Sequence, residues 1–165
     1  MRRNETDTGA GSRCNGTALR RATRRVSQLY DAVLAPSGLR STQRSILAHI
    51  ARAGSPSMGE LATMLVLDRS ALAHNLKPLD RDGLIAITVD PRDRRSRLVT
   101  LTGAGLQRLT ASAALWQEAQ RRFEEAFGAD DAKVLRATLD RIAALNFGDA
   151  DCGEGDGTGR RETGQ

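Results

Sequence analysis

The sequence predicts a mainly α-helical fold with one small β-hairpin, and three observations lead to that fold class. Aromatic residues make up only 3% of the 165 residues, and leucine, valine, isoleucine and alanine supply most of the apolar side chains, which favours helices over sheets. Over most of the chain, apolar residues recur at steps of three and four, as on one face of a helix. The region 84–101 is instead rich in β-branched residues. The length predicts a single compact domain.

Two helices are expected in the first third of the chain. The first, about 17–35, has one apolar stripe with four arginines off that stripe, and Pro36 and Gly38 end it. The second, about 41–53, turns its apolar residues inward and is followed by Gly54. The inward-facing residues of the two helices are Leu19, Ala22, Val26, Leu29 and Val33, then Ile46, Leu47 and Ile50.

The next segment has the pattern of a helix-turn-helix. Ser57 and Glu60 form a capping box that opens a short helix, and Asp68 can cap a second one after a short break. Pro78 conflicts with the second helix because it lacks a backbone donor, so we expect a bend there. The inner stripe of the second helix is Leu72, Leu76 and Leu79, and its outward candidates for DNA contact are Arg69, Ser70, Ala71, His74, Asn75 and Lys77.

A hairpin should follow the second helix of this motif. Two segments rich in β-branched residues, 84–89 and 98–101, flank a loop that carries four arginines and two aspartates. Arginines on a loop beside a helix-turn-helix suit the minor groove of DNA, whose negative potential attracts guanidinium groups. The alternative is a solvated loop whose Arg/Asp ion pairs contribute ~0–1 kcal/mol each.

Two long helical patterns finish the fold. One runs from about 103 to 127 as a single helix, and the other from about 130 to 146 after the acidic start Asp130-Asp131. A helix of about 24 residues spans about 36 Å, which is longer than a core of this size needs. Their heptad-like apolar steps favour packing against a partner chain, so these are expected to be dimerisation helices.

Composition narrows the class of protein. The formal net charge is +5, which favours a polyanionic partner such as double-stranded DNA. Residues 1–14 read as a disordered arm and residues 148–165 as a disordered, Gly-rich tail with five acidic residues against two arginines, so the part between them, 15–147, is the most basic. No apolar run is long enough for a membrane span or a secretory signal, and a cytoplasmic protein is expected.

Other chemistry finds little support in the sequence. Cys14 and Cys152 stand near opposite ends, so a structural disulfide is not expected, and the two histidines do not join them in a zinc spacing. No Ser/His/Asp set, paired carboxylates or phosphate-binding glycine loop indicates an enzyme, and no cofactor or metal is implied. The alternative from another class is a dimeric protein-interaction module without sequence-specific DNA binding.

The order of these motifs resembles the MarR family of winged-helix transcriptional regulators. The resemblance rests on Asp82-Gly83-Leu84-Ile85 after the helix-turn-helix, on Asp90-Pro91-Arg92-Asp93-Arg94-Arg95 in the hairpin loop, and on Leu101-Thr102-Gly103-Ala104-Gly105 after it. It covers about 15–147, with a DNA-binding lobe at about 40–102. It implies a homodimer, most simply a repressor, that binds a pseudopalindromic operator through two recognition helices and two wings.

The resemblance also implies roles for single residues. Arg95 would enter the minor groove, Asp93 would orient a neighbouring arginine, and the phosphate candidates are Arg92, Arg94 and Arg97. Family members bind small effectors near the second helix, which points to a pocket with Tyr30, Arg44 and Trp116, although helical spacing makes Tyr30 and Trp116 core or dimer-interface residues first. Arg44 stands where an aromatic or apolar residue is usual.

Cys14 offers a different release signal. It lies just before the first helix and near arginines, so its thiol could have a depressed pKa and react with peroxide. Family members that sense organic hydroperoxides carry a cysteine near this place, but they also use tyrosines of the second helix, and this chain has only Tyr30, in the first. A surface thiol without a role is the alternative.

Overall fold

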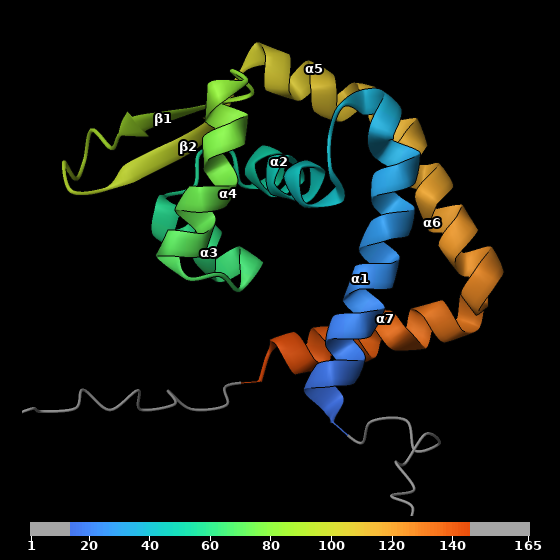
Figure 1. Ribbon diagram of the computed structural model, residues 1–165. Coiled ribbons are helices and arrows are strands. Elements are labelled where there is room, and N and C mark those ends of the chain that lie inside the picture. The colour runs from blue at the N-terminus through green and yellow to red at the C-terminus, as the bar shows by residue number, and fades with distance from the viewer. Residues whose placement is uncertain (1–13, 146–165) are drawn as a thin grey trace, which may run out of the picture.

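A computed structural model describes residues 14–145, and it is mainly helical with one antiparallel hairpin, as the sequence predicts (Figure 1). The predicted arm, apart from Cys14, and the whole of the predicted tail lie outside the described residues. None of the helices in the described range is long and apolar enough to cross a membrane. In chain order the elements are α1 (Asn15–Leu34), the 3-10 helix η1 (Ala35–Ser37), α2 (Ser41–Ala53), α3 (Met58–Leu65), α4 (Arg69–Arg81), β1 (Ile85–Val89), β2 (Arg97–Leu101), α5 (Gly103–Ala111), α6 (Ala113–Phe127) and α7 (Ala129–Ala143).

The elements from α2 to α5 form a lobe with its own hydrophobic core, called here the hairpin lobe. The predicted inner stripes of α2 and α4 meet in that core, and β1 and β2 close it on one side. Half-buried residues of α3 and α5 pack around the core. The fully or nearly fully buried residues are Leu39, Ile46, Leu47, Ile50, Leu61, Ala62, Leu72, Leu76, Leu79, Leu84, Ile85 and Val99.

The ends of α3 and α4 follow the capping signals in the sequence. The Ser57 hydroxyl accepts from the Glu60 N–H at 3.2 Å, and the Glu60 carboxylate accepts from the Ser57 N–H at 2.7 Å, which completes the capping box. The Asp68 carboxylate accepts from the Ala71 N–H at 2.7 Å and caps α4. Between the helices Val66 adopts a left-handed conformation with φ of 52°, so the connection is tight. The predicted helix-turn-helix is confirmed.

Helix α4 continues for three residues beyond Pro78. A proline in a helix interior removes one hydrogen bond and crowds the preceding turn. Leu76 and Leu79 on either side of it are buried in the core, and this packing holds the second half of α4 in place.

The hairpin is anchored to the helix-turn-helix at one edge and to α5 at its base. The N–H of Val99 donates to the Pro56 carbonyl at 2.9 Å, just before α3 begins. At the base, the Thr102 hydroxyl accepts from the Gly105 N–H at 3.0 Å and donates to the Gly83 carbonyl at 2.6 Å. A Cβ on Gly105 would lie 1.9 Å from the Leu84 carbonyl oxygen, so the Leu-Thr-Gly-Ala-Gly motif needs glycine at this position.

The prediction of one continuous helix over 103–127 is wrong. The structure has two helices, α5 and α6, which meet at Ser112. The Ser112 hydroxyl is fully buried, donates to the Leu109 carbonyl at 2.7 Å and accepts from Arg44 Nε at 3.1 Å. A serine hydroxyl that bonds back to the preceding turn competes with the helical ladder, and here a long-range partner stabilises the break.

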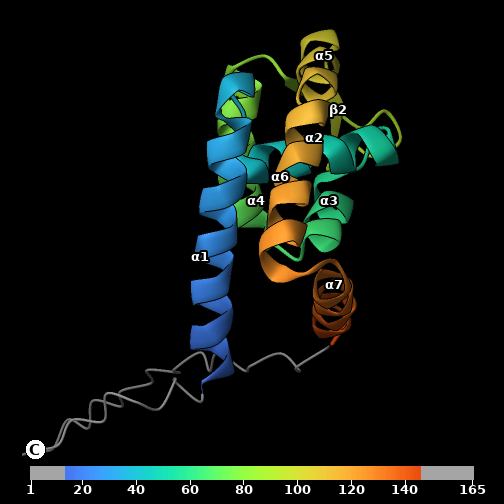
Figure 2. The same ribbon diagram turned by 90° about the vertical axis from the view of Figure 1, so that its right-hand side faces the viewer.

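Helices α1, α6 and α7 form a second body, called here the helical lobe, beside the hairpin lobe (Figure 2). Helix α1 packs along α6. Helix α7 folds back across the C-terminal end of α6, which is the end farther from the hairpin lobe (Figures 1 and 2). Tyr30, Val33 and Ala119 form the described buried cluster of the helical lobe, with half-buried neighbours around them. Leu34 of α1 and Ala132 of α7 are also buried. Predicted helix 130–146 is observed as α7, with Asp130 and Asp131 in its first turn.

Candidate nucleic-acid interface

Helix α4 presents one exposed face opposite its buried stripe. Because a helix repeats every 3.6 residues, burial of Leu72, Leu76 and Leu79 turns the intervening positions toward solvent. The predicted contact residues Arg69, Ser70, His74 and Lys77 are exposed, and Ala71 and Asn75 are half-buried at the edges of this face.

The sequence reasoning missed one residue in the middle of the exposed face. Ala73 is exposed and lies between Ser70 and Lys77 in the same row of the helix. Its methyl group carries no charge or hydrogen-bonding group, which is why it was not singled out. The spacing of three and four from Ser70 and Lys77 was the signal that could have found it.

The hairpin loop, residues 90–96, is shaped by its two aspartates. The Asp90 carboxylate accepts from the Arg92 N–H at 2.8 Å, and the Asp93 carboxylate accepts from the Arg95 N–H at 2.9 Å. These are Asx turns, in which an aspartate bonds the backbone two residues ahead. Asp93 therefore holds the backbone of Arg95 in place instead of pairing with a guanidinium group.

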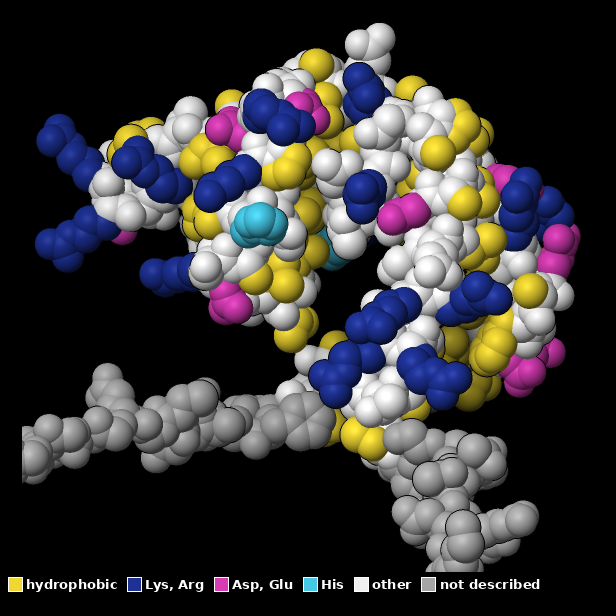
Figure 3. All heavy atoms as spheres, viewed as in Figure 1, with side chains coloured by type: hydrophobic (Ala, Val, Ile, Leu, Met, Phe, Trp, Pro, Cys, Tyr) yellow, Lys and Arg dark blue, Asp and Glu magenta, His cyan; other side chains and the backbone are white. Residues whose placement is uncertain are grey.

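The arginines of the hairpin are left available for an external anion. Arg92, Arg94, Arg95 and Arg97 are exposed, and no ion pair involves them within residues 14–145. Figure 3 shows basic side chains reaching out from the hairpin tip and lying over α4 on the same side of the molecule. The structure thus brings together the predicted contact residues of α4 and of the hairpin loop.

The three residues predicted for an effector pocket meet at the junction of the two lobes. The Arg44 guanidinium of α2 lies 4.4 Å from the centroid of the Trp116 ring of α6, and Tyr30 of α1 packs edge-on against that ring at 5.0 Å. The Tyr30 hydroxyl donates to Gln120. Burial lowers the pKa of the Arg44 guanidinium. Burial, helped by the negative charge of Glu124, raises the pKa of Tyr30.

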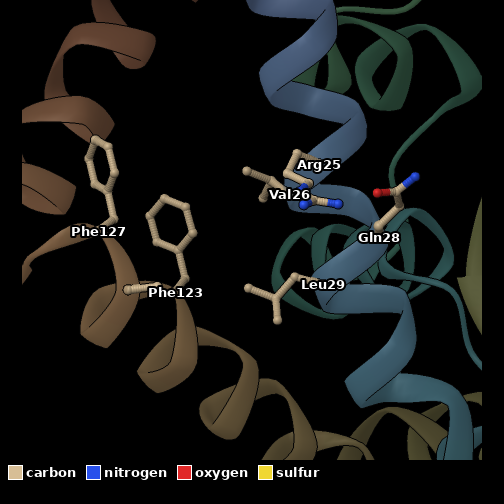
Figure 4. Close-up of a pocket in the computed structure, with 7 residues that line it drawn as sticks. Arg25, Val26, Gln28, Leu29, Phe123 and Phe127 are labelled. Atoms are coloured by element: carbon tan, nitrogen blue, oxygen red, sulfur yellow. The ribbon is translucent and has the colours of Figure 1, made fainter.

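The helical lobe has one cavity beside this cluster and a second one farther along α1 and α6. One, of about 420 Å³, is lined by Tyr30 and Trp116 but not by Arg44. Its other walls are Val26, Ser27, Ser41, Thr42, Ser45, Gln120, Phe123, Leu135, Arg136 and Leu139. The second, of about 500 Å³, opens between α1 and α6, where Phe123 and Phe127 face Val26 and Leu29 (Figure 4). Both are of the size that holds a small organic molecule.

Cys14 takes the N-cap position of α1 and is exposed. Hydrogen bonding to Thr17 lowers the pKa of its thiol. It lies far along α1 from the junction of Tyr30, Arg44 and Trp116, so the structure does not bring the predicted redox residue to the predicted pocket (Figure 1).

Comparison with known proteins places this arrangement in a family. A model of the MarR family matches residues 37–96, from the end of η1 through the hairpin loop. The structure of the M. tuberculosis transcriptional regulator MosR in complex with DNA is 33% identical, with 79% of this chain and 93% of that chain covered and a TM-score of 0.72. The chain belongs to the MarR family of winged-helix transcriptional regulators.

Two further relatives extend the comparison. The structure of the transcriptional repressor CouR bound to a 23-mer DNA duplex is 31% identical, with 85% of this chain and 99% of that chain covered and a TM-score of 0.74. The transcriptional activatory protein BadR of Rhodopseudomonas palustris is 41% identical over 71 residues. The chain spans 41% of the length of BadR in that match. In MarR-family terms, α3 and α4 are the helix-turn-helix and the hairpin is the wing.

Proposed function

We propose that this chain binds DNA sequence-specifically as a homodimer on a pseudopalindromic operator. The observation that carries the proposal is the set of exposed hairpin arginines without a carboxylate partner in the described chain, beside the exposed face of α4. A basic loop and a polar helix face on one side of a lobe suit the minor and major grooves of one duplex. The likeness to MosR and CouR, whose structures contain DNA, supports the same docking here.

The residues divide by the part of DNA that each can reach. Arg95, held by the Asp93 turn, enters the minor groove, while Arg92, Arg94 and Arg97 neutralise phosphates. On α4, the base-reading candidates among the predicted residues are His74, Asn75 and Lys77, with Arg69 and Ser70 at the helix start and Ala71 and Ala73 as apolar contacts.

The exposed apolar surface of the helical lobe supports the proposed homodimer. Large apolar side chains of α1, α6 and α7 remain exposed in a single chain, and a second copy that covers them would place two α4 helices in adjacent half-sites, about 34 Å apart. The exposed residues are Leu19, Phe127, Val134 and Leu139 in these helices and Leu145 just after α7.

We further propose that the protein is a repressor and that a small molecule releases it from the operator. CouR is a transcriptional repressor and BadR is a transcriptional activatory protein, so relatives of this chain regulate in both directions. Repression is the simpler mechanism, because a protein bound to its operator blocks transcription directly. The effector is an apolar molecule of modest size that enters the cavity beside Tyr30 and Trp116 and changes the spacing of the two α4 helices.

Release by an oxidant through Cys14 is a second candidate. The exposed position of the thiol and its hydrogen bonding to Thr17, which lowers its pKa, favour reaction with a peroxide. If this is correct, Cys14→Ser removes the response of DNA binding to peroxide and leaves binding itself unchanged. An unchanged peroxide response in that variant rules the thiol out.

The test of the DNA-binding proposal compares duplex from upstream of the gene with scrambled duplex at one fixed salt concentration, because phosphate contacts alone bind any sequence. A preference of roughly 10³-fold or more identifies a sequence-specific regulator. Arg95→Ala should weaken operator binding by about 1–3 kcal/mol, while Arg52→Ala, an exposed arginine at the end of α2, should not. Absence of binding to either duplex would favour a protein-interaction module.

A further inference from the structure

The N-terminal half of α1 presents four arginines that DNA binding by α4 and the wing does not use. Arg20, Arg21, Arg24 and Arg25 lie in two adjacent rows, because residues four apart stack along a helix. All four are exposed, and no described acidic side chain forms an ion pair with them. Residues 15–30 contain no aspartate or glutamate. This arginine face therefore concentrates positive charge that a polyanion would neutralise.

The chain carries a matching acidic segment just beyond α7. Residues 149–156, with the sequence Asp-Ala-Asp-Cys-Gly-Glu-Gly-Asp, hold four carboxylates and no basic residue, and are called here the acidic run. Both Figure 1 and Figure 2 place the C-terminal end of α7 level with the N-terminal half of α1.

The chain after α7 can reach further than half the length of α1. Leu145 is the last described residue, and the acidic run begins four residues later. An extended chain covers about 3.3 Å per residue, so the run can extend from about 13 to about 36 Å beyond Leu145. Half of a 20-residue helix is only about 15 Å long.

We propose that the acidic run docks on the arginine face of α1. Four carboxylates meet four guanidinium groups, the pairing in which charge-assisted hydrogen bonds are strongest. Exposed ion pairs are individually weak, so the docked state depends on all four pairs and on low salt. Since DNA phosphates have the same charge chemistry, the docked run also keeps the arginine face from binding duplex of any sequence.

Two native cysteines can report on this contact. Cys152 lies in the middle of the acidic run. The Cys14 sulfur and the Arg20 guanidinium lie 3.9 and 3.6 Å from the position that a Cβ would take on Gly16, so the thiol is at the edge of the arginine face. Docking would raise the local concentration of Cys152 around Cys14 and speed a disulfide between them.

The test oxidises the full-length protein with diamide and follows the Cys14–Cys152 disulfide by non-reducing electrophoresis and peptide mass spectrometry. The two thiols lose two electrons and two protons to the diamide, which becomes the hydrazine. The rate should fall about tenfold when the effective concentration is lost, either at about 0.5 M salt or after charge removal. The two charge-removing variants are D149N/D151N/E154Q/D156N and R20Q/R21Q/R24Q/R25Q.

Two control variants remove charge outside the acidic run and the arginine face. R160Q/R161Q alters the same tail without removing a carboxylate, and R52Q removes an exposed arginine of α2, so neither should slow the reaction. A disulfide whose rate depends on these charges supports the proposal, whether it forms within one chain or between two copies. The position of the band on the non-reducing gel shows whether the acidic run docks on its own chain or on a second copy. A rate that is the same in all variants and at both salt concentrations overturns it.

A second measurement needs no cysteine. Deleting residues 148–165 should raise the affinity for scrambled duplex at low salt, and the rise should vanish when the arginine face is also neutralised. Equal affinity for scrambled duplex with and without the acidic run would contradict docking, even if the protein proves to be an excellent operator binder.

Discussion

The hairpin lobe and the helical lobe differ in how much of their core one chain can close. The hairpin lobe has a cluster of twelve buried residues, whereas the corresponding cluster in the described part of the helical lobe has three. On α1, α6 and α7, large apolar side chains stay in solvent and two cavities open between helices. The hairpin lobe therefore closes its core within one chain. The helical lobe leaves large apolar side chains exposed, which supports the proposed second copy.

The two lobes are connected by contacts of polar side chains, whereas the core within each lobe is apolar. Arg44 of the hairpin lobe crosses to Trp116 and Ser112, and Arg108 donates to the Ser37 carbonyl at 3.1 Å near the end of α1. A few hydrogen bonds and one cation–π contact are easier to rearrange than a packed core. Under the effector mechanism proposed above, this difference would let each hairpin lobe move as a unit when a ligand binds.

The largest effect should come from placing charges on the exposed apolar surface at α7 and just after it, because this tests whether a second copy covers the helical lobe. Val134→Glu with Leu145→Glu places two carboxylates on side chains that are 65% and 58% exposed in one chain, so the monomer should fold. If a second copy covers them, the dimer dissociates and operator binding falls by roughly 10³-fold, because one half-site is lost. Analytical ultracentrifugation and fluorescence anisotropy with operator DNA measure the two effects.

Leu106→Glu is the matched control for that experiment. Leu106 is 54% exposed, but it lies on α5 in the hairpin lobe. It should leave the dimer and operator binding unchanged. If the α7 variant remains a dimer, the helical lobe is completed in some other way.

The next largest effect should come from closing the contact between α5 and the hairpin. Gly105→Ala forces a methyl group into the Leu84 carbonyl, and the backbone must shift, at a cost of about 2–4 kcal/mol of unfolding free energy. Gly103→Ala, two residues away in the same helix, meets nothing within 4 Å and should be neutral or stabilising. Urea denaturation of the two variants separates these outcomes, and equal stability would mean that α5 does not pack on the Leu84 backbone.

How far the sequence predicts the structure depends on whether the deciding contacts are local. The bounds of α2 match the prediction at both ends, and Ser57 and Asp68 cap the helices as expected, because capping is decided by residues three positions apart. The break at Ser112 was missed because it depends on Arg44, which is 68 residues away in the chain.

The candidate site divides in the same way. The exposed face of α4 follows from its period, apart from Ala73, whose side chain carries no chemical signal. The turns made by Asp90 and Asp93 show why the hairpin arginines are not neutralised locally, although the sequence also allowed ion pairs within the loop. The cavity beside Tyr30 is assembled from four helices, and no local pattern in the chain could have given its walls.

Removing the Arg44 contacts between the two lobes should have a smaller effect on stability. Arg44→Gln removes the guanidinium from Trp116 and Ser112 and should lower the unfolding free energy by about 0.5–2 kcal/mol, because a partly buried cation–π contact and a charged hydrogen bond are lost. The emission of Trp116 should change as well. Arg40→Gln, an exposed arginine just before α2, is the control. A double-mutant cycle with Ser112→Ala should show coupling, and strict additivity would mean that the two side chains do not act together.

The smallest effect concerns the capping box of α3, and its sign depends on pH. Hydrogen bonds from the Ser57 backbone and side chain lower the pKa of the Glu60 carboxylate in the folded protein from its ordinary 4.5. A carboxylate whose folded pKa is depressed stabilises the fold at pH values above its unfolded pKa, and this contribution is lost as the pH falls through the folded pKa. Glu60→Gln should therefore be less stable than the parent at pH 7 and nearly equal to it under acidic conditions, because glutamine accepts the same hydrogen bonds without charge. Thermal unfolding at several pH values measures the difference. If the stabilities of the parent and of Glu60→Gln change with pH in parallel, the charge of Glu60 adds nothing to the cap. The start of the helix-turn-helix would then be held by the Ser57 hydroxyl and by the core beneath it.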